Sequence, residues 1–511
     1  MLAEDKNTAN KRIAKNTIFL SIRMLLVLCI NLYTTRVVLS NIGVEDYGIY
    51  NVVCGFVMMF TFINTSLTNG IQRFYNFELG KNQGEKLGVI YSTSLVIQVF
   101  IVLIMILLTE TLGLWYLNNK LVIPPDRLSA AQYIYQFSIL SFVFVIVQAP
   151  FSSAVLAYEK MDFYALVSVF VTIMKLAVAL CLPYWAGDRL KTYGLLLSLI
   201  SIIEFFLYYI YARLKFQSLR FTRPKDLGLF KYMFSFSGWN MFGSFANIMK
   251  EQGINIILNL FFGPVVNAAR GITNQINGGL QSFVSNFTIP VRPQVIKSYA
   301  ANDIDRTKNL TYIVSKLSCF FLYLLSLPLV AEIHFILKLW LGDNIPEYTS
   351  SFVIINILIS FVNNLNAAVS GIVHASGKMM LYQISTSFVS LLSLPMAYYL
   401  LKCGANPNWA IMMVFVTMVL VQIVSLYILK SIIEFSIFDY LRQVILPILL
   451  VIATTFCFPL IVNILITGGW IRLLINLGVS ILTVSISVYT LGLNYEERVF
   501  CNNIIKKLIK K

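Results

Sequence analysis

The chain has 511 residues, of which 58% are apolar and 12% charged, which is about half of the roughly 25% charged residues of a soluble domain. So few polar residues cannot cover a soluble fold of this length. The composition therefore predicts an integral membrane protein and excludes a secreted disulfide scaffold, a nucleic-acid-binding domain and most soluble enzymes. The net charge of +16, from 39 Lys and Arg against 23 Asp and Glu, is typical of basic cytoplasmic loops.

Fourteen stretches are long and apolar enough to cross a membrane, since a helix needs about 20 mainly apolar residues to span a core roughly 30 Å thick. In chain order they cover residues 15–39, 48–70, 89–116, 133–157, 163–185, 192–212, 233–258, 265–290, 310–338, 350–375, 379–401, 408–429, 444–466 and 470–493. The first is too long for the apolar part of a signal peptide, so we expect it to remain in place. The predicted fold is all-α, with about 14 transmembrane helices.

The loops between these stretches predict the orientation of the chain. With the N-terminus inside, the inside segments between these spans hold 25 Lys and Arg and the outside loops hold 5. Basic residues are enriched in cytoplasmic loops, so both termini are predicted to be cytoplasmic. The basic tail after Arg498 also carries apolar residues, as expected of a helix lying on anionic lipid.

A basic connector divides the chain. Residues 213–231 alternate basic and apolar side chains, which predicts an amphipathic segment on the cytoplasmic surface. It separates an N-terminal lobe of six helices, 1–212, from a C-terminal lobe of six, 232–429, and residues 430–511 add two helices and the tail. No loop is long enough to fold into a domain.

The second and eighth predicted helices resemble each other. They align without gaps at an offset of 223 residues, which matches Gly48 with Gly271 and Gly55 with Gly278. Each precedes a basic cytoplasmic loop. This pattern predicts a parallel repeat, and hence two pseudo-symmetric lobes around a central cavity.

Polar side chains recur every three or four residues along three helices, which places each set on one helical face. The sets are Asn240, Ser244, Asn247, Glu251, Asn255 and Asn259; Asn267, Arg270, Asn274, Asn277, Gln281, Ser285 and Thr288; and Asn356, Ser360, Asn363, Ser370 and His374. Any one of these residues is well explained as a hydrogen bond between packed helices. For whole faces we favour a water-filled cavity between the lobes.

Inside the predicted spans, basic residues outnumber acidic ones. The basic ones are Arg23, Arg36, Lys175, Lys250 and Lys316, against Glu204 and Glu251 at mid-depth. Charges in a span are costly and are expected to face a cavity or a partner. A positive polar cavity suits a hydrated anion such as a phosphate or pyrophosphate head group carrying sugars.

The predicted substrate-binding residues of this cavity share a polar or basic side chain on a cavity-facing helix. They are Arg23, Asn31, Arg36, Asn64, Lys175, Asn240, Asn247, Lys250, Arg270, Asn274, Gln281 and Asn363. Glu204 and Glu251 either bind a coupling proton or Na⁺ or are paired with Lys250, Arg23 or Lys175, and we favour pairing. Glu110, Glu332 and His334 lie nearer helix ends, where we expect them to reach interfacial water.

Three segments resemble a known family. The first is Asn16-Thr17-Ile18-Phe19-Leu20. The second, at the turn after the first predicted helix, is Arg36-Val37-Val38-Leu39-Ser40-Asn41-Ile42-Gly43-Val44-Glu45-Asp46-Tyr47-Gly48-Ile49-Tyr50. The third is Ala157-Tyr158-Glu159-Lys160-Met161. On these residues the chain resembles the polysaccharide-transport, or O-antigen flippase (Wzx-type), branch of the MOP exporter superfamily.

This resemblance implies a V-shaped exporter in the bacterial inner membrane. It implies a lipid-linked (undecaprenyl-pyrophosphate) oligosaccharide as substrate, moved to the outer leaflet by alternating access. Membrane lipids are expected partners, together with the polysaccharide polymerase or glycosyltransferases of the same pathway, and nucleic acid is not. Many relatives have 12 spans, and a count of 14 resembles the lipid II flippase branch.

Two other functions stay open on the sequence. One is a small-molecule or multidrug exporter of the same superfamily. The other is a membrane polymerase or transferase, which the absence of large loops and of a His/Asp constellation disfavours. Seven Cys without a CxxC pair and two His predict no metal site, and we expect no cofactor and no enzymatic activity.

Overall fold

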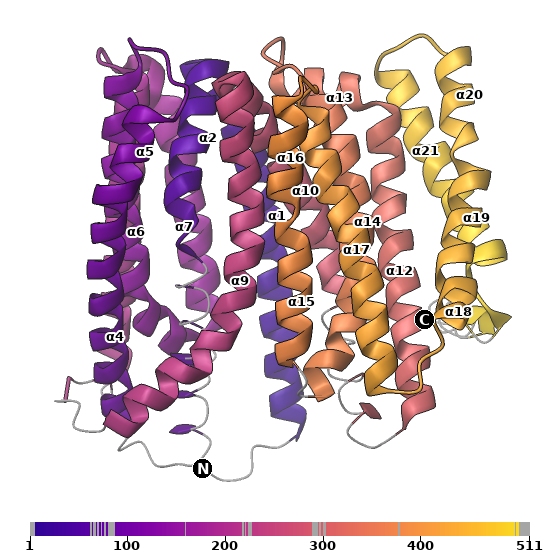
Figure 1. The fold of residues 1–511 in the computed structure, drawn as a ribbon, viewed down its shortest axis with the longest axis horizontal. Helices are drawn as coiled ribbons and strands as arrows, with labels where there is room; N and C mark the ends of the chain where they lie inside the picture. The colour runs from indigo at the N-terminus through magenta and orange to yellow at the C-terminus, as the bar shows by residue number, and fades with distance from the viewer. Residues whose placement is uncertain are drawn as a thin grey trace. The chain divides into compact units, whose positions relative to one another are not determined.

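The computed structural model is almost entirely helical (Figure 1). It describes residues 6–499 apart from short gaps at 62–63, 65–67, 69–70, 73, 76–77, 80–86, 159, 217–218, 220, 223–226, 289–294, 296–297, 300–302, 377–378 and 496. The side chains of 6–22, 25, 227–243, 367–368, 374–375 and 379 lie outside the described set. The described part of the chain contains no β-strand.

The first half of the chain forms long helices joined by short turns. They are α1 (Lys6–Ile42), α2 (Val44–Met58), α4 (Leu87–Leu108), η2 (Thr109–Gly113), α5 (Leu114–Asn119), α6 (Leu128–Ala157), α7 (Met161–Cys181), η3 (Leu182–Tyr184), α8 (Arg189–Lys215), α9 (Leu227–Phe262) and α10 (Pro264–Thr288). Gly43, at φ +85°, joins α1 to α2 with a bend of 118°. Glycine adopts this left-handed backbone without the steric cost of a Cβ.

The second half contains shorter helices, several of which continue one another. They are α12 (Ile304–Ala331), α13 (Ile333–Leu341), α14 (Thr349–Ser376), α15 (Met379–Leu391), α16 (Ser393–Lys402), α17 (Asn408–Ile432), α18 (Ile437–Tyr440), η5 (Leu441–Ile445), α19 (Leu446–Thr455), α20 (Cys457–Leu465), α21 (Trp470–Ser487) and η6 (Val488–Gly492).

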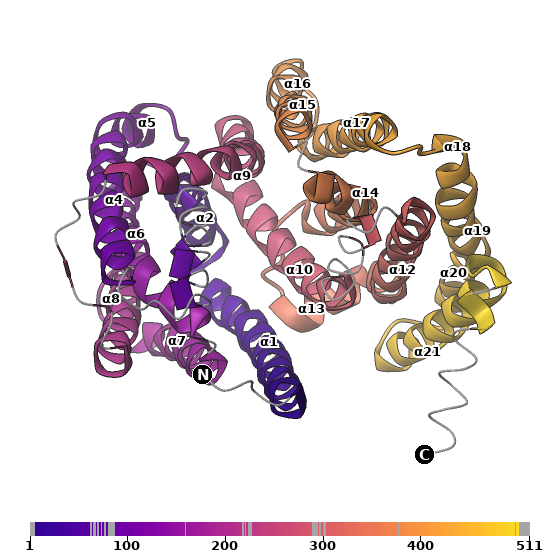
Figure 2. The same cartoon turned by 90° about the horizontal axis from the view of Figure 1, so that it is seen from below.

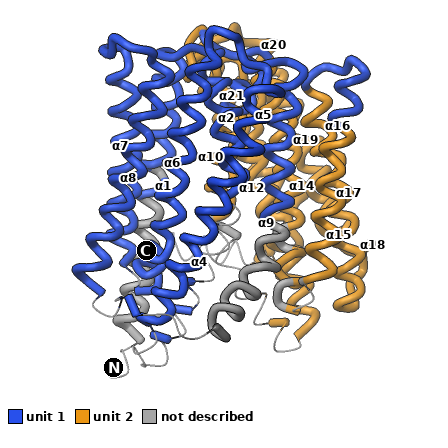
Figure 3. Tube along the Cα trace, turned by 60° about the vertical axis from the view of Figure 1, so that its left-hand side comes forward, with its two compact units in different colours: residues 1–272, 344–347, 397–407 blue, residues 273–343, 348–396, 408–511 orange. Residues whose placement is uncertain are grey.

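The helices form two compact units, coloured separately in Figure 3. Unit 1 contains residues 1–272, 344–347 and 397–407, and unit 2 contains 273–343, 348–396 and 408–511. In unit 1, α6 packs along α8 and α1 along α7, as the view along the helices shows (Figure 2). The chain passes from one unit to the other within α10. The lobe boundaries predicted at 212, 231 and 429 stay a prediction.

Ten described helices are long and apolar enough to cross a membrane, or eleven if the bent pair α1–α2 is one span. The predicted spans coincide with helices or with consecutive helices, except that span 48–70 coincides with α2 only as far as Met58 and most of 62–70 lies outside the described residues. The predicted all-α membrane fold is confirmed. The number of 14 stays a prediction. The two predicted spans outside this set are α9 and α10, which carry two of the three polar faces.

The core of unit 2 lies where α12 meets α14, α17 and the C-terminal helices. Cys319, Phe320 and Tyr323 of α12 pack there with Tyr440 and Val451 of the C-terminal segment. Two ion pairs tie the same elements together. Lys316 Nζ lies 2.7 Å from Glu497 Oε2, and Arg472 Nε lies 2.6 Å from Glu332 Oε1.

Glu332 corrects one expectation. We expected its side chain to reach interfacial water, and this is wrong, because the carboxylate is fully buried beside Arg472 and Asn476. Glu332 does lie near a helix end, as predicted, because it sits at the break between α12 and α13. Its partners come from residues 140 and more positions later, which no local pattern reveals.

Candidate functional site

A buried cluster of three charged residues lies on α9 and α10 in unit 1. Arg270 Nη2 donates to Glu251 Oε2 at 2.7 Å, and Lys250 Nζ lies 3.7 Å from Glu251 Oε1. Arg270 is 1% exposed and Lys250 3% exposed, whereas the Glu251 side chain is 40% exposed. Two cations therefore share one carboxylate, and the cluster is accessible from the Glu251 side.

The Arg270 guanidinium is only partly bonded. Its Nε and Nη1 are buried and find no hydrogen-bond partner among the described residues. A guanidinium carries five N–H groups, and a buried polar group without a partner is costly. With one positive charge in excess and free donors, the cluster can bind an anion that presents two oxygens, such as a phosphate.

Asparagines on the same two helices bond to one another. Asn267 Nδ2 donates to the carbonyl and side-chain oxygens of Asn255 at 2.7 and 2.6 Å, and Asn259 Nδ2 donates to Asn267 Oδ1 at 3.0 Å. Asn255 Nδ2 also donates to the Asn51 carbonyl of α2 at 3.3 Å. This part of the predicted polar faces is therefore helix-to-helix bonding. In unit 2, Ser360 Oγ bonds Asn277 Oδ1 in the same way.

Glycines let α2 approach α9 and α10 closely. A Cβ on Gly48 would lie 1.8 Å from the Pro264 carbonyl oxygen, and one on Gly271 would lie 2.6 Å from Asn51 Oδ1. Small residues permit such contacts between membrane helices. We call this contact between α2 and α9–α10 the α2 seam; it borders the charged cluster, because Glu251 is one helical turn from Asn255.

A second polar cluster lies among α1, α6, α7 and α8. Arg23 Nη1 approaches Ser168 Oγ of α7 at 3.5 Å, and its guanidinium carbon lies 5.0 Å from the centre of the Tyr164 ring. Glu204 of α8 accepts a hydrogen bond from Gln148 Nε2 at 3.3 Å. Arg23 Nε and Gln148 Oε1 are buried and lack partners among the described residues.

The other predicted binding residues lie outside these two clusters. Asn31, Asn363 and Gln281 are half-buried, Asn64 has a buried Oδ1 without a described partner, and Arg36, Lys175, Asn247 and Asn274 are exposed. The side chain of Asn240 lies outside the described residues. Whether any of these residues binds substrate stays a prediction.

One cluster of charged residues was not predicted from the sequence. It lies where α1 meets α2, α5 meets α6 and η3 meets α8. Arg127 donates from Nε to Asp46 Oδ1 at 2.7 Å and from Nη1 to Asp188 Oδ2 at 3.0 Å, and its Nη2 bonds both carboxylates. Burial acts to lower the pKa of Arg127, but the two carboxylates outweigh it and raise the pKa. Asp46 belongs to the resemblance motif, which was the available signal.

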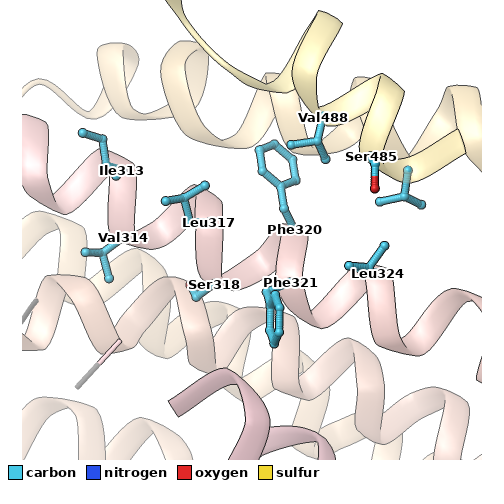
Figure 4. Close-up of a pocket in the computed structure, with 10 residues that line it drawn as sticks. Ile313, Val314, Leu317, Ser318, Phe320, Phe321, Leu324, Ser485 and Val488 are labelled. Atoms are coloured by element: carbon cyan, nitrogen blue, oxygen red, sulfur yellow. The ribbon is translucent and has the colours of Figure 1, made fainter. Parts of the chain in front are cut away.

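An apolar groove runs along α12 in unit 2. Figure 4 shows Leu317, Phe321 and Leu324 on α12 and Ser485 and Val488 on the neighbouring α21 and η6. Its volume is about 360 Å³. It offers two serine hydroxyls and otherwise hydrocarbon, so it suits an apolar chain rather than a charged group.

Comparison with known proteins gives a family and a fold. A family model described as "Polysaccharide biosynthesis protein" matches residues 13–296. No curated protein sequence matches the chain.

Several solved structures share the fold. An inward-facing multidrug resistance MATE family transporter of the MOP superfamily is 10% identical, with a TM-score of 0.68 over 81% of this chain and 97% of that one. The lipid II flippase MurJ in an inward closed conformation is 14% identical, with a TM-score of 0.67 over 96% and 100%. The Vibrio cholerae MATE transporter VcmN is 12% identical, with a TM-score of 0.59 over 83% and 97%. At these identities the likeness concerns the fold.

Proposed function

The chain belongs to the polysaccharide biosynthesis protein family, and from this membership we propose that it is a flippase for a lipid-linked oligosaccharide. The substrate is an undecaprenyl-pyrophosphate-linked repeat unit. The protein moves it from the cytoplasmic to the outer leaflet of a bacterial inner membrane by alternating access, with both termini in the cytoplasm. The product then serves the polymerase of the same pathway.

The observation that carries this proposal is the excess cation at Arg270. Lys250 and Arg270 exceed Glu251 by one charge, and two buried guanidinium nitrogens lack partners among the described residues. Arginine binds phosphate oxygens through paired N–H groups, whereas lysine offers a point charge. A pyrophosphate linker offers the oxygens that these donors lack. The fold shared with the lipid II flippase MurJ supports the same class of substrate.

The fold shared with MATE transporters makes a small-molecule exporter the second candidate. A cationic drug would be repelled by the surplus positive charge of the cluster, so the charges favour the flippase. An enzyme of the pathway is the third candidate, and the experiment below separates all three.

The test is complementation of a deletion strain with Arg270 variants. We expect deletion to remove surface polysaccharide and to accumulate intact lipid-linked repeat units in the cytoplasmic leaflet. Arg270→Gln should not restore polymer, because it removes the free cation, and Arg270→Lys should restore part of it, because it keeps the charge without the paired donors. Each variant is compared at equal membrane abundance.

Three results would contradict the proposal. Loss of polymer without accumulation of lipid-linked units would indicate an enzyme. Drug sensitivity with normal polymer would indicate a small-molecule exporter. Full complementation by Arg270→Gln would remove the charged cluster from the transport path.

A further inference from the structure

Residues 120–127, between α5 and α6, cross the same end of unit 1 as the α2 seam and are attached at two points. Near one end, the Val122 N–H donates to Asn259 Oδ1 at 2.9 Å, and the Val122 carbonyl accepts from Asn259 Nδ2 at 3.4 Å. At the other end, Arg127 binds Asp46 of α2 and Asp188 before α8. We call this segment the strap.

The two attachments differ in strength. The Arg127 bonds join a guanidinium to two carboxylates, each of them through two nitrogens. Charge-assisted bonds of this kind are about twice as strong as neutral ones. The Val122 attachment pairs a neutral peptide with a neutral amide, and such a bond contributes less to stability than a bond to a charged group. The Val122 attachment is therefore the weaker one, and we expect the strap to separate from α9 before it separates from α2 or α8.

The Val122 attachment lies at the turn where α9 becomes α10. Gly263 forms that turn at φ +75°, and a Cβ built there would meet Val122 Cγ1 at 4.0 Å. Asn259, which binds the strap, also bonds Asn267 of α10. One amide side chain thus joins the strap to both helices of the turn.

The α2 seam beside the strap has the features of a contact that forms and breaks. A neutral amide bond crosses it, from Asn255 Nδ2 of α9 to the Asn51 carbonyl of α2. Glycines make two of its close helix contacts, Gly48 against the Pro264 backbone and Gly271 against the Asn51 side chain. No ion pair joins α2 to α9 or α10 among the described residues, so separation leaves no charge unpaired.

We propose that the strap is a releasable latch on the α2 seam. It stays attached to α2 and α8 through Arg127, and it binds the α9–α10 turn through Val122 only while the seam is closed. Release of Asn259 from the Val122 peptide then accompanies opening of the seam above the charged cluster. This inference rests on the proposed function in so far as a flippase needs such a change of access.

The test measures two distances by pulsed electron paramagnetic resonance in the full chain in lipid nanodiscs, with the native cysteines replaced. Spin labels at Asp126→Cys and Val265→Cys report the distance from the strap to the α9–α10 turn. Labels at Asp126→Cys and Ala186→Cys report the distance from the strap to the loop before α8. All three positions are exposed. No substrate is needed, so the result does not depend on which molecule is transported.

We expect Asn259→Ala to raise the population of a longer 126–265 distance at least twofold and to leave the 126–186 distribution unchanged. Asn119→Ala is the matched control, because among the described residues Asn119 donates only to the Trp115 carbonyl within α5, and it should change neither distance. An unchanged 126–265 distribution in Asn259→Ala, or a change in the 126–186 distribution, would overturn the proposal.

Asn259 is fully buried, so a second variant leaves every buried amide in place. Val122→Pro removes the N–H that Asn259 accepts, at a residue that is 47% exposed. It should shift the 126–265 distances as Asn259→Ala does, and no shift in a folded protein would also overturn the proposal. If Arg270→Gln supports normal polysaccharide while these distances shift as expected, the proposed substrate site fails and the latch stands.

Discussion

Arg472 and Glu332 form a two-point ion pair, with Nε and Nη2 of the arginine 2.6 and 2.7 Å from the two carboxylate oxygens. The pair joins α21 to the break between α12 and α13. Asn476 Nδ2 donates to the same carboxylate at 2.6 Å, and Asn463 Nδ2 donates to the Ala331 carbonyl at 3.1 Å. The additional C-terminal helices are thus bonded to the end of α12 through a fully buried acid.

The two partners should respond unequally to substitution. Arg472→Leu leaves the Glu332 carboxylate buried with only Asn476 as a side-chain donor, which we expect to cost about 3 kcal/mol or more. Glu332→Leu leaves Arg472, which is 23% exposed and can reach water, so the loss should be about 1 kcal/mol. Melting temperatures in detergent measure the difference.

The double variant completes this test. With both charges replaced by leucine, no buried charge remains, so the double variant should be more stable than Arg472→Leu alone. Lys338→Leu is the control, because its contact with Asp343 is exposed on both sides. Equal melting temperatures for the two single variants would contradict the argument.

A charge exchange tests the pair at the other end of the C-terminal helices. Lys316 is 1% exposed and lies 2.7 Å from Glu497. Lys316→Glu places two carboxylates together in a buried site and should remove most folded protein from detergent extracts. Adding Glu497→Lys should restore a large part of it, as measured by size-exclusion chromatography. Failure of the exchange to restore any folded protein would show that Lys316 is needed for another contact.

The helices of this fold were predictable because each depends on its own apolar run. The partners of the charged residues were not predictable, because ion pairs depend on packing between segments that are distant in the sequence. Arg127 looked like an ordinary loop cation, yet it binds Asp46 and Asp188, which lie 81 and 61 residues away. The polar faces were placed on the correct helices. Periodicity cannot distinguish Asn255, which bonds across helices, from Arg270, which keeps unpaired donors.

The repeat predicted between the second and eighth helices gives a graded test of the α2 seam. Gly48→Ala should be the most damaging, because its Cβ would meet the Pro264 backbone, and we expect a loss of about 1–3 kcal/mol or more. Gly55→Ala should cost less, because its Cβ would lie 2.5 Å from the movable Gln252 side-chain oxygen.

Gly278→Ala is the matched control for this series, since Gly278 aligns with Gly55 in the repeat. A Cβ there meets nothing within 4 Å, and alanine favours a helix over glycine by about 0.5–1 kcal/mol. We therefore expect a neutral or slightly stabilised protein, as measured by melting temperature. The same loss at Gly278 as at Gly48 would contradict the close contact.

Glu204 and Glu251 differ in what surrounds them, and this decides which is the better candidate for ion coupling. Glu251 is paired with Lys250 and Arg270, whereas Glu204 accepts a hydrogen bond of 3.3 Å from the neutral amide of Gln148. A mid-membrane acid without a cationic partner among the described residues is a candidate for proton or Na⁺ binding. We predict that any coupling acts through Glu204.

The measurement is transport of the lipid-linked substrate after the proton and Na⁺ gradients are collapsed in turn. Wild-type transport should slow several-fold with one of them, and Glu204→Gln should be slow from the start and insensitive to both. Glu110→Gln is the matched control, because Glu110 also accepts a bond from a glutamine, Gln136, at 3.2 Å but lies in η2 nearer a helix end. It should keep the wild-type response. Wild-type transport that ignores both gradients would exclude coupling through Glu204 and leave removal of the product by polymerisation as the driving force.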